Sequence, residues 1–204
     1  MRSKEQDALQ MDIKRRDFLE LGFKLFSEKT IEMVNLTEVA EASPYGTATL
    51  YRYFAKKPGF VVAVAAWKWG QFKEENQNKR NDAAVEKMTA AEMFEIYLDS
   101  FLTLYKEHRD LLRFNQYFNI YVVSEKLGED VMKPYEGITN YTRERFHVIY
   151  SKALKDKTLR TDMPEEEMFS VTLHLMLAVV TRYAVGLVYK SGTDEMKELE
   201  LQKK

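Results

Sequence analysis

The stretch "TATLYRYFAKK", residues 47–57, places hydroxyls, aromatic rings and positive charges on one short element. In a helix, Leu50 and Phe54 share one face, and Ala48 and Arg52 lie on the opposite face. Hydroxyl and cationic side chains donate hydrogen bonds to phosphate oxygens, and a helix with one apolar and one compact polar face fits the major groove of DNA. These residue types in this order therefore indicate nucleic-acid recognition.

Two elements before this stretch would hold it in place. Residues 15–29, "RRDFLELGFKLFSEK", repeat apolar side chains every three or four positions, which predicts a helix with one apolar stripe. The sequence "NLTE" predicts a short helix in which Asn35 is the N-cap and Glu38 completes a capping box. The small Ala40 would let this helix approach the next one closely. Two short helices joined by a tight turn and packed on a longer helix form a helix-turn-helix.

Helical periodicity continues through the rest of the chain, and no run alternates apolar and polar residues as strands do. We therefore expect an all-α fold. An N-terminal three-helix DNA-binding domain, residues 1–56, would precede a larger helical ligand-binding and dimerisation domain, residues 57–204. Its first helix would begin near Lys57, and the polar segment 76–89 would follow as a boundary. The later helices are expected near 90–106, 109–124, 133–155 and 164–190, with a short one at the C-terminus.

The first third of the chain resembles the TetR (tetracycline-repressor-like) family of bacterial transcription regulators. The resemblance covers residues 16–65, from "FLELGFKLFSEK" through "LTEVAEA" and "TLYRYF" to "KKPGFVVAV". The run "TLYRYF" followed by Lys57 is its most specific part. A looser match, "LRTDMPEEEMF", resembles the family's lead-in to its penultimate helix. Between the two matches only length and helicity agree.

This resemblance implies a set of DNA contacts. They comprise two aromatic phosphate contacts, a lysine that grips a phosphate, the front of the recognition helix and the start of the second helix. In that order they are Tyr51 and Tyr53; Lys57; Thr47, Ala48 and Thr49; and Asn35 and Thr37. Arg52 is the side chain of the recognition helix that is suited to bidentate contact with guanine.

The DNA-binding stretch departs from the family pattern around its turn. Ser43 and Pro44 replace the usual Ala-Gly pair, and proline cannot adopt the left-handed conformation of a glycine. Gly46 replaces the usual serine cap. Three basic and two acidic side chains give residues 35–60 a net charge of only +1, and phosphate neutralisation drives most DNA affinity. One alternative is a plain three-helix packing unit. Another is a helical small-molecule- or protein-binding module with a degenerate DNA-binding head.

Residues 94–121 contain eight aromatic side chains. Aromatic residues at helical spacing are usually core, but Tyr117 and Tyr121 lie one turn apart near two asparagines, as polar tips do in pockets for organic ligands. In the family resembled, the middle helices of this domain hold an inducer. The residues considered for ligand binding are Tyr97, Phe101, Tyr117, Tyr121 and His174. His174 lies alone in an apolar helix. It would either face the ligand or be a core histidine that is hydrogen-bonded to a carbonyl group.

The expected helix over 164–190 is apolar nearly all round. A span of about 20 apolar residues is long enough to cross a membrane, but His174 and Arg182 interrupt this one. We expect no membrane span. The resemblance implies a homodimer through this helix and the C-terminal helix. A twofold dimer places two recognition helices about one DNA turn apart and predicts a pseudo-palindromic operator.

Composition and motifs exclude several other functions. The chain has no cysteine, which excludes thiolate nucleophiles, disulfides and Cys-ligated metals. Its three histidines have no metal-ligand spacing, and it has no Gly-rich phosphate loop, so we expect no enzyme, no metal and no cofactor. The alternative to a non-enzyme is an α-helical enzyme whose site lies among the aromatic residues. Measured turnover of a substrate would support it. The net charge of -1 requires any nucleic-acid site to be local.

The resulting prediction is a cytoplasmic, ligand-responsive transcriptional regulator. No apolar signal segment is visible in residues 1–17. The protein would bind a double-stranded DNA operator as a dimer and act as a repressor. A small organic or aromatic inducer would release it from DNA.

Overall fold

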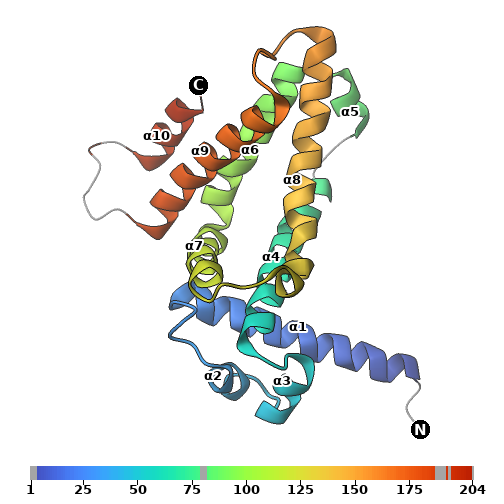
Figure 1. Cartoon of the computed structure of the whole chain (residues 1–204), viewed down its shortest axis with the longest axis vertical. Helices are drawn as coiled ribbons and strands as arrows, with labels where there is room; N and C mark the ends of the chain where they lie inside the picture. Colours follow the sequence, from blue (N-terminus) through green and yellow to red (C-terminus); the bar gives the residue numbers. More distant parts are fainter. Residues whose placement is uncertain (1–3, 79–81, 187–191, 193, 204) are drawn as a thin grey trace. The chain divides into compact units, whose positions relative to one another are not determined.

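The computed structural model describes residues 4–78, 82–186, 192 and 194–203, and these residues form helices and loops without a strand (Figure 1). The all-α fold is therefore confirmed for the described residues. The helices are α1 (Lys4–Glu28), α2 (Leu36–Glu41), α3 (Thr47–Tyr53), α4 (Lys57–Asn78), α5 (Asp82–Lys87), α6 (Ala90–Glu107), α7 (Arg109–Ser124), α8 (Glu129–Asp156), α9 (Glu165–Val185) and α10 (Glu195–Gln202).

The chain divides into two compact units. The first unit contains residues 1–71 and 114–136, and the second contains residues 72–113 and 137–204. Helix α4 belongs to both, because the division falls after Gln71. The predicted boundary after residue 56 separates functions rather than compact units and stays a prediction.

Helices α1 to α3 and the first half of α4 build the core of the first unit. Phe26 of α1, Leu50 of α3 and Phe60 of α4 are fully buried. The Phe60 ring centroid lies 5.8 Å from that of Phe26 and 4.8 Å from that of Phe54, the residue that ends α3. A Cβ atom on Gly22 would lie 2.4 Å from Cζ of Phe60, so this glycine permits the close approach of α1 and α4.

The turn between α2 and α3 is closed by a serine. The Ser43 hydroxyl donates to the carbonyl oxygen of Ala40 at 2.8 Å and accepts from the backbone N–H of Tyr45 at 3.0 Å. These hydrogen bonds replace the turn that a glycine would make, which explains how Pro44 is accommodated between α2 and α3. Helix α3 has Gly46 as its N-cap and no side-chain cap.

The predicted capping box of α2 forms only in part. Asn35 caps the helix, because its Oδ1 accepts from the backbone N–H of Glu38 at 2.8 Å. The Glu38 carboxylate does not return to the Asn35 backbone; it is paired with Lys29 at the end of α1. An ion pair between neighbouring helices has thus replaced the second half of the box.

The second unit is built around α6 and α9, which pack side by side (Figure 1). Tyr97 of α6, Phe146 of α8 and Phe169 of α9 form an aromatic core, with ring centroids 5.8 Å and 5.5 Å apart along that order. The C-terminal helix α10 is tied to α6, because Nζ of Lys203 donates to a carboxylate oxygen of Asp99 at 2.6 Å.

Several helix boundaries differ from the sequence prediction. Helix α8 begins at Glu129, four residues early, so Pro134 lies inside it rather than in its first turn. Two acidic residues in that first turn interact favourably with the positive end of the helix dipole, which explains the early start. Helix α9 ends at Val185, because Gly186 takes a φ of 110°; residues 187–190 of the predicted helix lie outside the described residues. The polar segment 76–89 contains the short helix α5.

Candidate nucleic-acid interface and ligand pocket

Helix α3 presents a polar face to solvent. Leu50 and Phe54 are buried, whereas Ala48 and Arg52 are exposed and Tyr51 is 45% exposed. This is the division that the spacing predicts. The apolar residues fix α3 on α1 and α4, so the exposed face is held in a defined orientation within the first unit.

The other predicted contact residues of α2 and α3 lie around this face. Thr47 and Thr49 are half-buried, and Asn35 and Thr37 are exposed at the start of α2. The side-chain oxygen of Asn35 is already used as a cap, which leaves its amide NH₂ group as a donor.

Tyr53 is half-buried on α3. Its hydroxyl is buried and has no hydrogen-bond partner among the described residues. Its ring centroid lies 6.3 Å from that of Phe18 in α1, and the guanidinium of Arg52 lies 5.6 Å from the same ring. A phosphate contact would require this hydroxyl to leave its buried position, so the role of Tyr53 in DNA binding stays a prediction. In the structure, its ring packs against Phe18 and Arg52.

Lys57 is half-buried at the start of α4. Its Nζ donates to the backbone carbonyl of Glu32 at 3.3 Å and lies 5.7 Å from the ring centroid of Tyr121 in α7. Burial lowers the pKa of this ammonium. A phosphate contact would require the side chain to leave these partners, so its predicted role in DNA binding stays a prediction.

The structure adds Tyr45 and Lys14, two residues near α3 that sequence reasoning missed. Tyr45, in the turn before α3, donates its hydroxyl to Oδ2 of Asp17 in α1 at 2.6 Å, and this hydrogen bond raises the pKa of the Tyr45 phenol. Nζ of Lys14 lies 5.5 Å from the Tyr45 ring centroid. The basic run 14–16 of α1 thus approaches the turn before α3, and the letters "KRR" in the sequence were the available signal.

The predicted ligand-binding residues belong to both units. Tyr97 and Phe101 are buried in the second unit with ring centroids 5.4 Å apart. Tyr121 is buried and Tyr117 half-buried in α7, within the first unit. His174 is exposed on α9, so the core-histidine interpretation is wrong. Among the described residues, no side chain buries this part of α9.

Tyr97 has a buried hydroxyl without a partner. That hydroxyl makes no hydrogen bond to the described residues, and burial raises its pKa to about 12. The guanidinium of Arg145 lies 5.6 Å from the ring centroid. An unsatisfied buried hydroxyl is costly, so a polar ligand group that paired with it would be stabilising. The role of Tyr97 in ligand binding stays a prediction.

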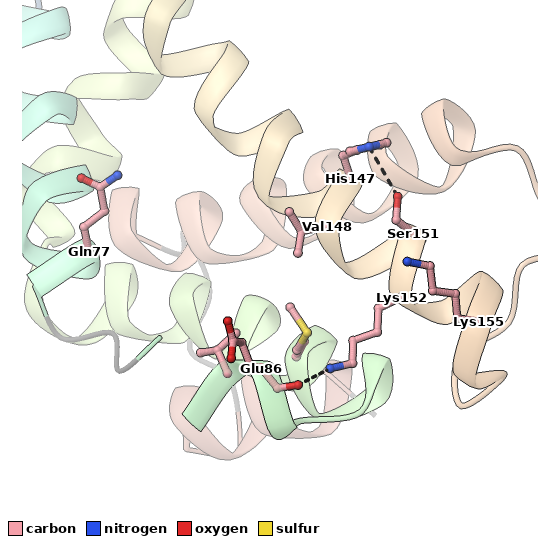
Figure 2. A pocket seen from close by; sticks show the side chains of 9 residues that line it. Gln77, Glu86, His147, Val148, Ser151, Lys152 and Lys155 are labelled. Carbon is pink, nitrogen blue, oxygen red and sulfur yellow. Dashed lines mark hydrogen bonds between the residues drawn. The ribbon is translucent and has the colours of Figure 1, made fainter. Parts of the chain in front are cut away.

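A pocket of about 990 Å³ lies in the second unit (Figure 2). Its wall is formed by the end of α4, by α5 and the start of α6, and by one face of α8. The residues that line it are Gln77, Val85, Glu86, Met93, His147, Val148, Ser151, Lys152 and Lys155. None of these was predicted from the sequence as a ligand-binding residue.

His147 at this pocket links α8 to α9. Its Nδ1 lies 2.9 Å from Oε1 of Glu165, and Oγ of Ser151 lies 3.4 Å from its Nε2. The same order of groups occurs in serine hydrolases. However, the His147 side chain is 64% exposed. Ser151 lies inside α8, where backbone N–H groups are bonded within the helix and cannot form an oxyanion hole. We therefore assign these contacts a structural role. Among the described residues, no group of three or more acidic or histidine side chains could hold a metal ion.

Asp156 joins the end of α8 to the start of α6 beside the pocket. Its carboxylate accepts from the backbone N–H of Ala90 at 2.7 Å and from that of Thr158 at 3.0 Å. These hydrogen bonds, the one from Thr158 first, hold the pKa of Asp156 below its ordinary value.

Asp156→Ala is expected to lower the melting temperature at neutral pH more than Glu144→Ala, which removes an exposed carboxylate from the middle of α8. Because the folded-state pKa is depressed, the stabilisation is fully present above the unfolded pKa of about 4 and is lost as pH falls through the folded value. Thermal unfolding followed by circular dichroism should therefore show the two variants converging at acidic pH. A difference that does not change with pH would contradict this assignment.

No family model and no curated protein matches the sequence. Solved structures match its fold. The transcriptional regulator FadR from Bacillus subtilis, in complex with stearoyl-CoA, is 14% identical, with 92% of this chain and 95% of that chain covered and a TM-score of 0.67. A bacterial regulatory protein in the tetR family from Rhodococcus RHA1 is 12% identical, with coverages of 93% and 92% and a TM-score of 0.70. AibR, in complex with isovaleryl coenzyme A and operator DNA, is 14% identical, with coverages of 93% and 95% and a TM-score of 0.58.

The chain has the fold of TetR-family transcriptional regulators. The fold predicted from the resemblance in residues 16–65 is thereby confirmed over more than nine tenths of the chain. At these identities, the similarity concerns the fold, and the function needs support from the chain's own residues.

Proposed function

We propose that this chain is a ligand-responsive transcriptional regulator that represses by binding a pseudo-palindromic DNA operator as a homodimer. A small organic ligand would release it. The observation that carries the proposal is the exposed polar face of α3, which is fixed from behind by the buried Leu50 and Phe54. A helix held in this way by a helix-turn-helix is the element that reads the major groove. The proposal assigns the chain no catalytic role and places it in the cytoplasm.

In this proposal the exposed side chains of α3 divide into two roles. Tyr51 donates its hydroxyl to a phosphate, and Arg52, supported by the Tyr53 ring, donates to a guanine edge. Thr47 and Thr49 contact the sugar-phosphate backbone of the DNA beside α3. The basic run 14–16 of α1 supplies the positive charge that residues 35–60 lack. AibR, which shares the fold, was solved with operator DNA, which supports this use of the fold.

The exposed apolar face of α9 supports a homodimer. Val171 and Leu175 are each 58% exposed and lie one turn apart on a helix that is apolar over most of its length. Among the described residues, α9 is long and apolar enough to cross a membrane, and a third of its apolar window is buried. The core helix of a soluble protein can have the same length and composition. We propose that a second copy of the chain covers this face.

Ligand and operator would oppose each other's binding. If the ligand favours one arrangement of the protein and DNA favours another, each lowers the affinity of the other by the same factor. FadR and AibR, solved with acyl-coenzyme A ligands, are regulators of this fold, which supports a ligand-controlled mechanism here.

The test is recovery of duplex fragments of the source genome by the purified protein. The double variant Tyr51→Ala, Arg52→Ala removes two exposed side chains of α3, and Lys24→Ala removes an exposed cation of α1 as a matched control. We expect wild type and control to recover fragments that share an inverted repeat. The double variant should lose on the order of a hundredfold in affinity, because each base or phosphate contact contributes about 1–3 kcal/mol. Equal binding by the double variant, or no shared repeat, would favour a module with a degenerate DNA-binding head.

A further inference from the structure

The pocket of the second unit is lined by more basic than acidic side chains. Two lysines, Lys152 and Lys155, and one glutamate, Glu86, line it. Lys152 also interacts electrostatically with Asp156 and Glu92, which do not line the pocket. Lys152 is partly occupied, since its Nζ donates to the backbone carbonyl of Glu86 at 2.9 Å and ties α8 to α5 (Figure 2). For Lys155, no hydrogen bond or ion pair is found with the described residues. The pocket therefore holds an ammonium group that is free to bind an anion.

Apolar side chains lie on the same wall. Val85 of α5, Met93 of α6 and Val148 of α8 line the pocket together with the lysines. Val148 is 49% exposed and lines this pocket of about 990 Å³. An apolar ligand group that covers Val148 would remove its side chain from water, which favours binding. The pocket thus combines a cationic region with an apolar one.

We propose that this pocket binds an anionic amphiphile, a small molecule with a carboxylate or phosphate at one end and an aliphatic chain at the other. Lys155, with Lys152 beside it, receives the anionic end through charge-assisted hydrogen bonds. The aliphatic chain covers Val148 and reaches Met93. A cationic ligand would meet two ammonium groups, and a neutral alcohol would leave Lys155 without a counter-charge. The class of ligand is inferred from the pocket alone. Only the further step, that this ligand is the inducer, rests on the proposed function.

The direct test is isothermal titration calorimetry of the full chain without DNA. The probes share an eight-carbon chain and differ in their head: octanoate, octyl phosphate, octanol and octylammonium. We expect both anions to bind, with octanol at least about tenfold weaker because it lacks the charge-assisted hydrogen bond. Octylammonium should be the weakest of the four. The two anionic probes distinguish a preference for carboxylate from one for phosphate.

Two substitutions place the binding in this pocket. Lys155→Gln keeps most of the side chain and removes the charge, and Lys106→Gln removes an exposed ammonium of α6 outside the pocket as its matched control. We expect Lys155→Gln to weaken anion binding on the order of tenfold and Lys106→Gln to leave it unchanged. Val148→Glu adds a like charge at a half-exposed site that tolerates polar groups, and it should abolish binding of both anions.

Equal affinities for the anion, the alcohol and the ammonium compound would overturn the proposal. So would anion binding that Lys155→Gln and Val148→Glu leave intact. Because the titration contains no DNA, its result is independent of operator recovery. Anion binding that depends on Lys155 without any operator would support the ligand class and count against the proposed function. An operator-binding protein that ignores all four probes would do the reverse.

Discussion

Replacing Phe60 with alanine is expected to lower the free energy of unfolding of the first unit by about 3–5 kcal/mol. The ring is fully buried, and its neighbours Phe26 and Phe54 belong to α1 and to the end of α3. Removing the ring would leave a cavity between three helices that are too well packed to collapse into it. Because Phe54 would lose its partner, α3 would also lose part of its support, and DNA affinity should fall together with stability.

Urea denaturation followed by tryptophan fluorescence measures this effect locally. Both tryptophans of the chain, Trp67 and Trp69, lie on α4 within the first unit. Tyr51→Ala serves as the control, because it removes an aromatic ring that is largely exposed and should change the midpoint only slightly. An equally small change for Phe60→Ala would contradict the assignment of Phe60 to the core.

Gly22 provides a second measurement of the same contact. An alanine there would favour the helix by about 1 kcal/mol, yet its Cβ would overlap the Phe60 ring and destabilise the packing by about 1–3 kcal/mol. We therefore expect Gly22→Ala to be destabilising in the wild-type chain and much less so beside Phe60→Leu. A double-mutant cycle gives the coupling energy. Additive effects would show that the two residues do not meet.

The arrangement of α3 could be predicted from the sequence, because it depends only on helical spacing. Leu50 and Phe54 are four residues apart, so they had to share a face once the stretch was helical. The same geometry limits the tyrosines. Tyr51 and Tyr53 are two residues apart, or about 200° around the helix, and cannot face the same way. The exposed Tyr51 and the buried hydroxyl of Tyr53 agree with this angle.

The pocket could not be predicted, because its walls come from distant parts of the sequence. Lys152 meets the backbone of Glu86, and Asp156 meets that of Ala90, each across 66 positions. Neither pair forms a local motif. The partner of Glu38 was missed for a similar reason, since Lys29 belongs to another helix. Local periodicity predicts which residues share a face, but it does not identify the side chain on the facing element.

Leu175→Glu is expected to convert the dimer that we propose into a monomer. Leu175 and Val171 are exposed on α9, and the exposed residues His174 and Ala178 continue the same face. A twofold interface repeats every substitution, so two carboxylates would be buried near each other without a partner. Breaking complementarity in this way costs about 2–5 kcal/mol or more, which weakens association by a factor of about 30 to several thousand.

Sedimentation equilibrium measures the change. Leu154→Glu is the matched control, because Leu154 is a leucine of α8 that is 48% exposed and lies off the α9 face. We expect wild type and Leu154→Glu to be dimers and Leu175→Glu to be a monomer with an unchanged circular dichroism spectrum. A dimer that survives Leu175→Glu would exclude this face of α9 as the interface.

The same variant tests whether dimerisation and operator recognition depend on each other. A monomer retains the complete face of α3 and its charge, so its weak, salt-dependent binding to any duplex should remain. It loses the second half-site, because only a twofold dimer places two recognition helices one DNA turn apart. Leu175→Glu should therefore remove the preference for an inverted repeat while leaving non-specific binding unchanged. Loss of both would indicate that α9 contributes to the fold of the chain rather than to its pairing.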